Sequence, residues 1–506
     1  MCGIAGSLKA IATDDVHRML TRLRHRGPDG SGLDDTPLGS LGHTRLAILD
    51  VAGGRQPIHF QAYSISFNGE IYNHQTLRQQ YLADLSAQTR TDTEVIVQLY
   101  ARLGPRCVEQ LDGMFALAIV GPDEFFLARD PIGIKPLYTA HRGDTLFFAS
   151  EIKALTDVAD DIREFPPGHW YHSQLGLRQY YTVGQDLTLL DDNVLNELRT
   201  LTSDDQVLPV IRHTLHAAVQ KRLMSDVPLG VSLSGGLDSS VVALLSQREH
   251  EQINTFAVGV EGSSDLAAAR EVAQFLGTRH HERIYTERDM VDALPQVLYY
   301  LESFDPALVR SAMPNYFLAQ LCAEHVKVFL TGEGADELYA GYDYLAQFDQ
   351  PDALHAELVH IIGALHNTNL QRADRMSMAH GLEARVPFLD VRSIALALGL
   401  PAVWKMRGEG RPAKALLRRA FADQLPTAII NRPKEKFSKG AGSSEIIAQR
   451  AEATITDREL ADERRRFAQA WNYHLPNKEA LYYYRVLRDS YQDDWILPNM
   501  GHSRSL

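Results

Sequence analysis

In the first third of the chain, hydrophobic and polar residues alternate over short segments that are separated by turn residues. The segment Tyr63–Phe67 alternates with a period of two, as a half-buried strand does. Further strands are expected at Leu41–Asp50, Met114–Val120, Glu124–Arg129, Leu137–Ala140 and Thr145–Ala149. One amphipathic helix is expected after Thr91 or Asp92, either of which is a good N-cap. This pattern of many short strands predicts an antiparallel β-sandwich.

The second half has a different pattern, in which continuous apolar segments alternate with helical ones. Apolar segments at Pro228–Leu233, Asn254–Val260 and Val326–Leu330 are typical of buried strands. Val207–Met224 places Leu208, Ile211, Leu215 and Val219 on one helix face, and a helix is also expected at about 265–276. Strands that alternate with helices predict a doubly wound parallel sheet, with ligands at the C-terminal ends of its strands.

A polar stretch separates these two regions. Residues 181–206 show no sustained period, so we expect a linker between a domain at 2–180 and a domain at 207–506.

Composition narrows the classes of function. The chain has 506 residues and a net charge of −13, which argues against nucleic acid as a partner and requires that an anionic ligand be held by local groups. Its apolar segments are shorter than the roughly 20 residues that cross a bilayer, so no membrane partner is expected. Three cysteines and the absence of a secretory signal at the N-terminus favour a cytoplasmic protein without disulfides.

The segment Ser234–Ser239 follows one of the expected strands and precedes a helix expected from Val241. Glycines let a backbone approach a ligand, and the free N–H groups at a helix N-terminus attract phosphate. The alternative is a Ser/Gly-rich turn without a ligand. The strand before and the helix after it favour the phosphate site.

Three acidic residues, Glu333, Asp336 and Glu337, follow another expected strand. A divalent metal would relieve the repulsion among them. The alternative is that Asp336 or Glu337 caps a helix.

Cys2 directly follows the initiator methionine. If Met1 is removed, the new α-amino group, with a pKa of about 7.7–8.0, can assist the thiol as a nucleophile. Asn68-Gly69 is a candidate oxyanion hole, although Asn-Gly is also the common sequence of a type I′ hairpin turn.

Several motifs together resemble known families. The first half resembles class II glutamine amidotransferase domains through Cys2-Gly-Ile, Arg24–Gly30, Gly42–Leu46, Phe67–Asn73, Asp92–Glu94, Leu111–Phe115 and Ala128–Tyr138. The second half resembles the synthetase domain of glutamine-dependent asparagine synthetases through Ser234–Ser239, Phe256–Gly259, Thr331–Glu337, Glu383–Asp390 and Lys434–Ser438. Together the motifs cover nearly the whole chain.

The first resemblance implies a four-layer α-β-β-α sandwich of the N-terminal-nucleophile hydrolase type. It implies that Cys2 is the nucleophile and that Asn68 and Gly69 form the oxyanion hole. It implies a glutamine site in which Arg45 holds the α-carboxylate, Asp92 and Glu70 hold the α-amine, and Ile48 lies beside them.

The second resemblance implies an ATP-pyrophosphatase fold that releases AMP and pyrophosphate. The adenosine site would contain Leu233, Val258, Thr331 and Gly332, and the phosphates would contact Ser234, Gly235, Gly236, Asp238 and Ser239. Asp238 and Asp336 would bind Mg2+, Glu333 would be the base for ammonia, and Arg310 and Lys434 would neutralise phosphate charge.

The implied function is ATP-dependent synthesis of asparagine from aspartate, with glutamine as the nitrogen donor and ammonia passing between two sites. Glutamine, aspartate and ATP are then the expected partners, and a homodimer is left open. One alternative is the same chemistry on a different carboxylate. Another is a non-catalytic regulator that senses glutamine or ATP.

Overall fold

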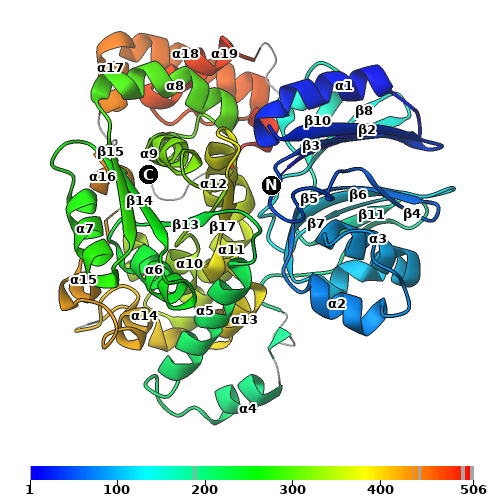
Figure 1. Ribbon diagram of the computed structural model, residues 1–506. Helices are drawn as coiled ribbons and strands as arrows, with labels where there is room; N and C mark the ends of the chain where they lie inside the picture. Colours follow the sequence, from blue (N-terminus) through cyan, green and yellow to red (C-terminus); the bar gives the residue numbers. More distant parts are fainter. Residues whose placement is uncertain are drawn as a thin grey trace.

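Two domains lie side by side in the computed structural model of the chain (Figure 1). The structure describes residues 2–185, 189–190, 192–408, 410–435, 437–442, 446–491 and 496–501. In this part of the chain, no helix combines the length and the hydrophobicity that spanning a membrane requires.

The N-terminal domain consists of two stacked antiparallel sheets with helices on both outer faces (Figure 1). The first sheet has the order β10-β8-β9-β1-β3-β2 and contains β1 (Gly3–Leu8), β2 (Gly30–Thr36), β3 (Gly39–Arg45), β8 (Tyr138–Arg142), β9 (Thr145–Ala149) and β10 (Asp160–Glu164). The second has the order β12-β11-β7-β6-β5-β4 and contains β4 (Ile58–Phe60), β5 (Tyr63–Ile71), β6 (Gly113–Val120), β7 (Phe125–Arg129), β11 (His169–His172) and β12 (Gly176–Gln179). Helix α1 (Thr13–Arg22) covers the first sheet, and α2 (His74–Tyr81) and α3 (Asp92–Leu103) cover the second. The expected four-layer α-β-β-α sandwich is confirmed.

Two strand boundaries in this domain differ from expectation. Strand β3 ends at Arg45, so the expected strand over Leu41–Asp50 is too long. Strand β5 continues to Ile71, and its residues Asn68 and Gly69 pair with Ala116 and Phe115 of β6. The alternative interpretation of Asn68-Gly69 as a type I′ turn is therefore wrong, because hydrogen-bonded pairing with β6 outweighs the local turn preference of this dipeptide.

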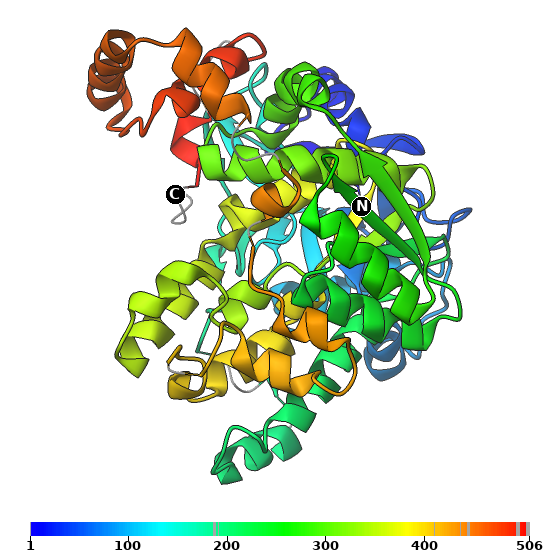
Figure 2. The same cartoon turned by 90° about the vertical axis from the view of Figure 1, so that its left-hand side faces the viewer.

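The expected linker contains a helix, α4 (Asp192–Thr200), which corrects its description as irregular; residues 186–188 and 191 of the linker lie outside the described part. Val194, Leu195 and Leu198 of α4 pack against the core of the second domain. Their spacing of three to four residues is a helical signal, too short to stand out among polar neighbours. Figure 2 places α4 at the end of the molecule opposite the C-terminal helices.

The C-terminal domain is built on a parallel sheet with the order β15-β14-β13-β16-β17. Its strands are β13 (Leu229–Ser232), β14 (Asn254–Gly259), β15 (Arg279–Ile284), β16 (Val328–Leu330) and β17 (Glu383–Arg385). The strand order reverses between β13 and β16, which confirms the doubly wound sheet and places a crevice between the ends of these two strands.

Helices surround this sheet and extend the domain (Figure 1). They are α5 (Leu208–Arg222), α6 (Leu237–Glu249), α7 (Ser264–Leu276), α8 (Glu287–Leu301), α9 (Pro306–Ala323), α10 (Ala335–Leu338), α11 (Pro351–Gly363), α12 (Asn369–Met378), α13 (Val391–Gly399), α14 (Ala415–Ala420), α15 (Thr427–Asn431), α16 (Phe437–Gly440), α17 (Ile446–Thr454), α18 (Asp457–Trp471) and α19 (Lys478–Arg488). Helix α6 begins at Leu237, four residues earlier than expected, so Asp238 and Ser239 belong to its first turn.

The two domains share buried apolar surface. Leu23 and Ile152 of the first domain belong to the same core cluster as Leu301 and Phe304 of the second. Burial of such side chains is the main force that holds two domains together, so their relative placement is fixed by packing as well as by charge.

Candidate functional sites

Cys2 lies in the N-terminal domain, immediately before β1, and is buried. Its backbone N–H donates a hydrogen bond to Asn68 Oδ1 at 3.0 Å, and its thiol donates to the carbonyl of Leu46 at 3.9 Å. Burial raises the pKa of the Cys2 thiol. A buried thiol needs a nearby base to become the thiolate, and an α-amino group on the same residue meets that need.

The side-chain amide of Asn68 uses its oxygen, Oδ1, to bind Cys2 but leaves its nitrogen, Nδ2, without an acceptor among the described residues. Its side chain is fully buried, and in the described part of the chain no group accepts a hydrogen bond from Nδ2. A buried donor left open is costly unless a ligand satisfies it. The position and the chemistry of Nδ2 fit an oxyanion hole beside Cys2.

Two of the expected glutamine-binding residues, Glu70 and Asp92, are buried carboxylates in the same domain as Cys2 and Asn68. Glu70 follows Asn68 on β5, and burial raises its pKa well above the ordinary range, with Glu383 and Asp92 adding to the effect. Asp92 accepts hydrogen bonds from the backbone N–H groups of Ile71 and Thr93, each at 2.8 Å, while Thr91 caps α3. Both oxygens of Asp92 thus accept backbone hydrogen bonds, whereas Glu70 Oε2 has no hydrogen-bond partner among the described residues, so Glu70 is the more available of the two to bind a ligand.

Arg45 is the last residue of β3, and Ile48 lies on the segment that follows this strand. Arg45 donates to the carbonyls of Val51 and Asp50 at 2.9 and 2.8 Å, which orients its guanidinium and leaves further N–H groups for a carboxylate. Ile48 is buried in a small cluster with Val328, a residue of the other domain. Its carbonyl accepts a hydrogen bond from the Asp226 N–H at 3.1 Å.

The C-terminal domain supplies two charged residues to this region that were not assigned a role from the sequence. Arg385 and Glu383, both on β17, are fully buried, and Arg385 Nε donates to Glu383 Oε1 at 2.6 Å. A second nitrogen of Arg385 lies 3.7 Å from Glu70 Oε1. The sequence places both residues in the motif Glu383–Asp390, but the motif does not indicate which site they face.

The second candidate site lies where β13 and β16 end. After β13 the chain turns through Gly235, whose φ of +68° favours glycine and whose missing Cβ would lie 2.4 Å from the backbone of Ala268. Ser239 Oγ accepts from the Ser234 N–H at 3.2 Å and donates to the Gly236 carbonyl at 3.1 Å. These contacts close the segment Ser234–Ser239 into a compact loop at the N-terminus of α6.

The loop after β16 packs directly on this first loop. A Cβ on Gly332 would lie 2.8 Å from the Cβ of Asp238 and 3.0 Å from the Ser239 nitrogen, so only glycine fits. The Thr331 N–H donates to the carbonyl of Arg385 at 2.9 Å, which joins the second loop to β17.

Two carboxylates and two ammonium groups meet between the loops. Lys414 Nζ lies 2.7 Å from Asp336 Oδ1 and also binds Asp238, and Lys434 Nζ lies 2.6 Å from Asp336 Oδ2. Burial opposes ionisation of Asp336, but Lys414 and Lys434 hold its pKa well below the ordinary range. Burial also opposes the charge on Lys434, but Asp336 and Asp238 raise its pKa above the ordinary value.

These residues fit a magnesium ion that is bound together with phosphates. Asp238 Oδ1 is buried, and no hydrogen-bond partner for it is found among the described residues. Within the same residues, no group of three or more His, Cys, Asp or Glu side chains could hold a metal alone. Mg2+ is commonly held by one or two carboxylates plus substrate phosphates, which is the donor set available here.

Glu333 and Arg310 line the same cavity but are paired with other residues. Arg372 of α12 forms an ion pair with Glu333. Arg310 of α9 binds Glu479 through two nitrogens, one of them at 2.9 Å. A substrate group would therefore compete with Arg372 for Glu333 and with Glu479 for Arg310.

The cavity brings together most of the expected ATP-binding residues. Its lining includes Ser234, Gly236, Asp238, Ser239, Thr331, Gly332, Glu333, Asp336, Arg310 and Lys434. Leu233, Gly235 and Val258 are not among the described residues that line it. Leu233, directly after β13, and Val258, in β14, are both buried. Lys436, in the expected Lys434–Ser438 motif, lies outside the described residues.

The cavity is richer in positive charge than the protein as a whole. Its cations are Arg310, Arg372, Lys414, Arg418, Arg432 and Lys434, and its carboxylates are Asp238, Asp265, Glu333, Asp336 and Glu435. Of these cations, only Arg310 and Lys434 were assigned a role from the sequence. This local balance agrees with the expectation that an anionic ligand is held by nearby groups in a chain of net charge −13.

Comparisons with known proteins agree with this pair of sites. A family model described as a glutamine amidotransferase domain matches residues 1–167, and one described as asparagine synthase matches residues 210–351 and 343–495. Asparagine synthetase B [glutamine-hydrolyzing] of Escherichia coli (strain K12) is 39% identical over 519 residues, which are 96% of this chain and 90% of the relative. The chain belongs to the asparagine synthetase family.

Other asparagine synthetases show the same likeness. A probable asparagine synthetase [glutamine-hydrolyzing] of Schizosaccharomyces pombe is 39% identical over 97% of this chain and 93% of its own length. Among solved structures, a glutamine phosphoribosylpyrophosphate amidotransferase from B. subtilis aligns with 50% of this chain and 65% of its own, at 22% identity and a TM-score of 0.33. The family identification therefore rests on sequence likeness that spans both candidate sites.

Proposed function

We propose that the protein synthesises asparagine from aspartate, with ATP as the source of energy and the side-chain amide of glutamine as the source of nitrogen. It is then a carbon–nitrogen ligase that releases glutamate, AMP and pyrophosphate. The observation that carries this proposal is that glutamine-hydrolyzing asparagine synthetases align with 96–97% of the chain, so that one likeness spans both Cys2 and the Ser234–Ser239 loop.

In the N-terminal domain, Cys2 is the nucleophile. After removal of Met1, the α-amino group of Cys2 takes the thiol proton, and the sulfur attacks the amide carbon of glutamine. Asn68 Nδ2, which has a free donor, and the Gly69 N–H stabilise the oxyanion. Ammonia leaves, and water then hydrolyses the thioester to give glutamate and the free thiol.

The charged residues around Cys2 orient glutamine. Arg45 has N–H groups left to hold the α-carboxylate, because only two of its donors bind backbone carbonyls. Glu70, together with Asp92, holds the α-ammonium group. A positive ligand would restore the charge on Glu70, whose pKa burial now raises.

In the C-terminal domain, the β-carboxylate of aspartate attacks the α-phosphorus of ATP. The bond between the α- and β-phosphates breaks, and the Ser234–Ser239 loop holds the departing pyrophosphate. Asp238 and Asp336 would hold Mg2+, which neutralises phosphate charge when bound. Lys434 and Arg310 turn toward the phosphates, and Thr331 and Gly332 lie beside the nucleoside.

Ammonia completes the reaction at the activated aspartate. It attacks the β-carbonyl carbon of the aspartyl adenylate, Glu333 accepts a proton from the nitrogen, and AMP leaves as asparagine forms. An internal passage between the domains keeps ammonia from being protonated in bulk water. We place the reaction in the cytoplasm, which the three buried, unbridged cysteines support, and we leave a homodimer open.

The test is an assay of pyrophosphate release with MgATP and glutamine and a panel of carboxylates as acceptors. We expect release with aspartate, with one asparagine formed per pyrophosphate, and little release with glutamate, malonate or no acceptor. Release with another carboxylate in preference to aspartate would overturn the choice of acceptor. A lack of release with every acceptor would overturn the ligase function.

A further inference from the structure

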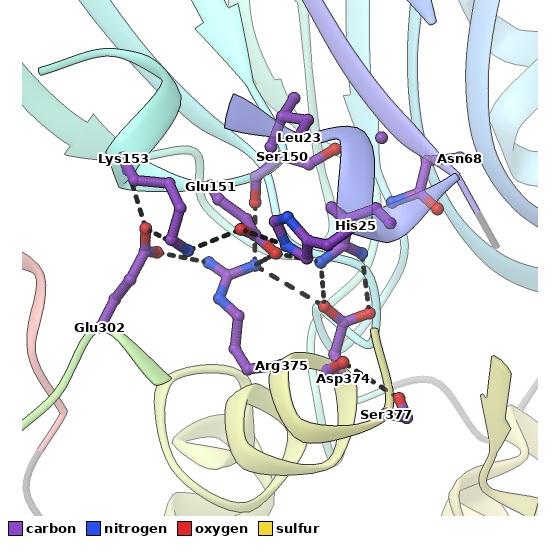
Figure 3. Close-up of polar contacts among 12 residues, drawn as sticks. Leu23, His25, Asn68, Ser150, Glu151, Lys153, Glu302, Asp374, Arg375 and Ser377 are labelled. Atoms are coloured by element: carbon purple, nitrogen blue, oxygen red, sulfur yellow. Dashed lines mark hydrogen bonds and ion pairs between the residues drawn. The ribbon is translucent and has the colours of Figure 1, made fainter. Parts of the chain in front are cut away.

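Helix α12 is in contact with both candidate sites. Its Arg372 forms an ion pair with Glu333, the proposed base for ammonia. Two residues later, Asp374 contacts Arg26 of the other domain. Figure 3 shows Asp374 and Arg375 extending from one helix, with Arg375 reaching toward Glu151 and Glu302.

Arg26 connects Asp374 to the proposed nucleophile. Its side chain is fully buried, and its Nε donates a hydrogen bond to the carbonyl of Cys2 at 3.0 Å. The two other nitrogens donate to Asp374 Oδ2 at 2.7 Å and Oδ1 at 3.1 Å, and one of them also donates to Glu151 at 2.6 Å. A guanidinium held by two oxygens of one carboxylate has a fixed plane, so its Nε has a fixed direction.

The charge on Asp374 is maintained although the residue is buried. Burial opposes ionisation, but Arg26 and Lys135 hold the pKa of Asp374 below the ordinary range. The Asp374–Arg26 contact is therefore a charged, bidentate one across the domain boundary. Removing the charge from one partner of such a pair leaves the other buried without full compensation.

We propose that Asp374 is a positioning residue for glutamine hydrolysis, supplied to the glutaminase site by the synthetase domain. It acts through Arg26, which holds the Cys2 carbonyl and thereby sets where the thiol lies relative to Asn68. Because α12 also carries Arg372 to Glu333, one helix fixes both the proposed nucleophile and the proposed base. This inference rests on the proposed role of Cys2 as the nucleophile.

The variant Asp374→Asn tests the proposal, because it keeps the shape of the side chain and removes the charge. Full-length protein is assayed for glutamate release from glutamine and, separately, for pyrophosphate release with ammonia, aspartate and MgATP. We expect the kcat for glutamate release to fall on the order of 10- to 100-fold, with KM and the ammonia-dependent rate changed less than about threefold. A misplaced thiol slows the attack and leaves glutamine binding largely intact.

The matched control is Glu302→Gln. Glu302 belongs to the same buried ionic cluster, where it pairs with Lys153 at 2.9 Å and Arg375 at 3.0 Å, and none of its recorded contacts within the described residues is to Arg26. It loses an equally buried charge at the same domain boundary. We expect its kcat for glutamate release to stay within about threefold of the unmodified protein.

The proposal is overturned if Asp374→Asn releases glutamate at the unmodified kcat, or if Glu302→Gln loses as much kcat as Asp374→Asn does. If Asp374→Asn does not fold, Asp374→Glu takes its place, since it keeps the charge and displaces the guanidinium; an unchanged kcat in that variant also overturns the proposal. Failure of the proposed function is distinguishable, because then the unmodified protein would release no glutamate.

Discussion

Asp238 and Asp336 share one ammonium group, because Lys414 Nζ lies 2.5 Å from Asp238 Oδ2 and 2.7 Å from Asp336 Oδ1. The two carboxylates come from different loops, one at the start of α6 and one in α10. A lysine that bridges them balances part of their negative charge. If MgATP binds here as proposed, Lys414 would turn to phosphate oxygens and leave both carboxylates to the cation.

We expect Asp336→Asn to raise the Mg2+ concentration needed for half-maximal pyrophosphate release by about tenfold or more, because one of two anionic ligands is lost. The measurement is a titration of activity with Mg2+ at saturating ATP. Asp343→Asn is the control, since Asp343 is a nearby aspartate whose side chain is 85% exposed. An unchanged Mg2+ requirement in Asp336→Asn would exclude Asp336 as a ligand.

We expect Cys2→Ala to abolish glutamine-dependent synthesis, by at least about 1000-fold, and to leave ammonia-dependent synthesis intact. The reason is that the thiol is needed only for release of ammonia from glutamine. Both rates are measured as pyrophosphate release. Cys107→Ala removes another buried thiol and should keep glutamine use. Loss of the ammonia-dependent rate in folded Cys2→Ala would show that the two roles are not separate.

Asn68→Asp separates the two functions proposed for Asn68. The aspartate keeps an oxygen that can accept from the Cys2 N–H, but it lacks the Nδ2 donor. We expect kcat for glutamate release to fall on the order of 100- to 1000-fold, as losses of oxyanion-hole donors do. Asn68→Ala, which lacks both groups, should lose at least as much. If Asn68→Asp hydrolyses glutamine at the normal rate, Nδ2 is not the donor.

Lys405 gives a prediction for stability against pH. Burial lowers the pKa of Lys405 to about 7, and its Nζ donates to the carbonyl of Ala397 at 2.7 Å. In the unfolded chain a lysine has a pKa near 10.4. Between pH 7 and 10 the Lys405 side chain is therefore protonated to a greater extent in the unfolded chain than in the folded protein. The contribution of Lys405 to stability therefore rises with pH across this window and is smallest below pH 7.

Lys405→Met should accordingly be more stable than the unmodified protein near pH 7, and the advantage should shrink toward pH 9.5. The change across this window is at most a few kcal/mol, at about 1.4 kcal/mol per unit of pKa shift. Urea unfolding at pH 7.0 and 9.5 measures it. An advantage that does not depend on pH would mean that Lys405 is not held near neutrality.

Much of the fold could be predicted because its signals are local. The period of two in Tyr63–Phe67 and the apolar segments that became β13, β14 and β16 are read within a few residues. Strands β15 and β17 are not predicted because β15 is a polar edge strand, Arg279–Ile284, and β17 is a three-residue strand in which two residues are charged. In both, pairing with a neighbouring strand decides the conformation more than composition does.

The candidate sites were predictable only where motifs contain their own chemistry. The Ser234–Ser239 loop and the Cys2 region are recognisable in the sequence from the spacing and the types of their residues. Lys414 is 176 residues from its partner Asp238, and Arg26 is 348 residues from Asp374. No local pattern encodes such a pair, since the fold alone brings the two charges together. Glu383 and Arg385 belong to a motif that is recognisable in the sequence, but neither their burial nor the domain that they face is.

The contact at Gly332 joins the two nucleotide loops into a single body. With no side chain on Gly332, the backbones of the two loops pack directly against each other at Asp238 and Ser239. If the loops bind ATP as proposed, the phosphates and the nucleoside would contact two loops that pack against each other. Under that proposal ATP would contact both loops at once, whereas a fragment such as pyrophosphate or adenosine would contact fewer of the same residues.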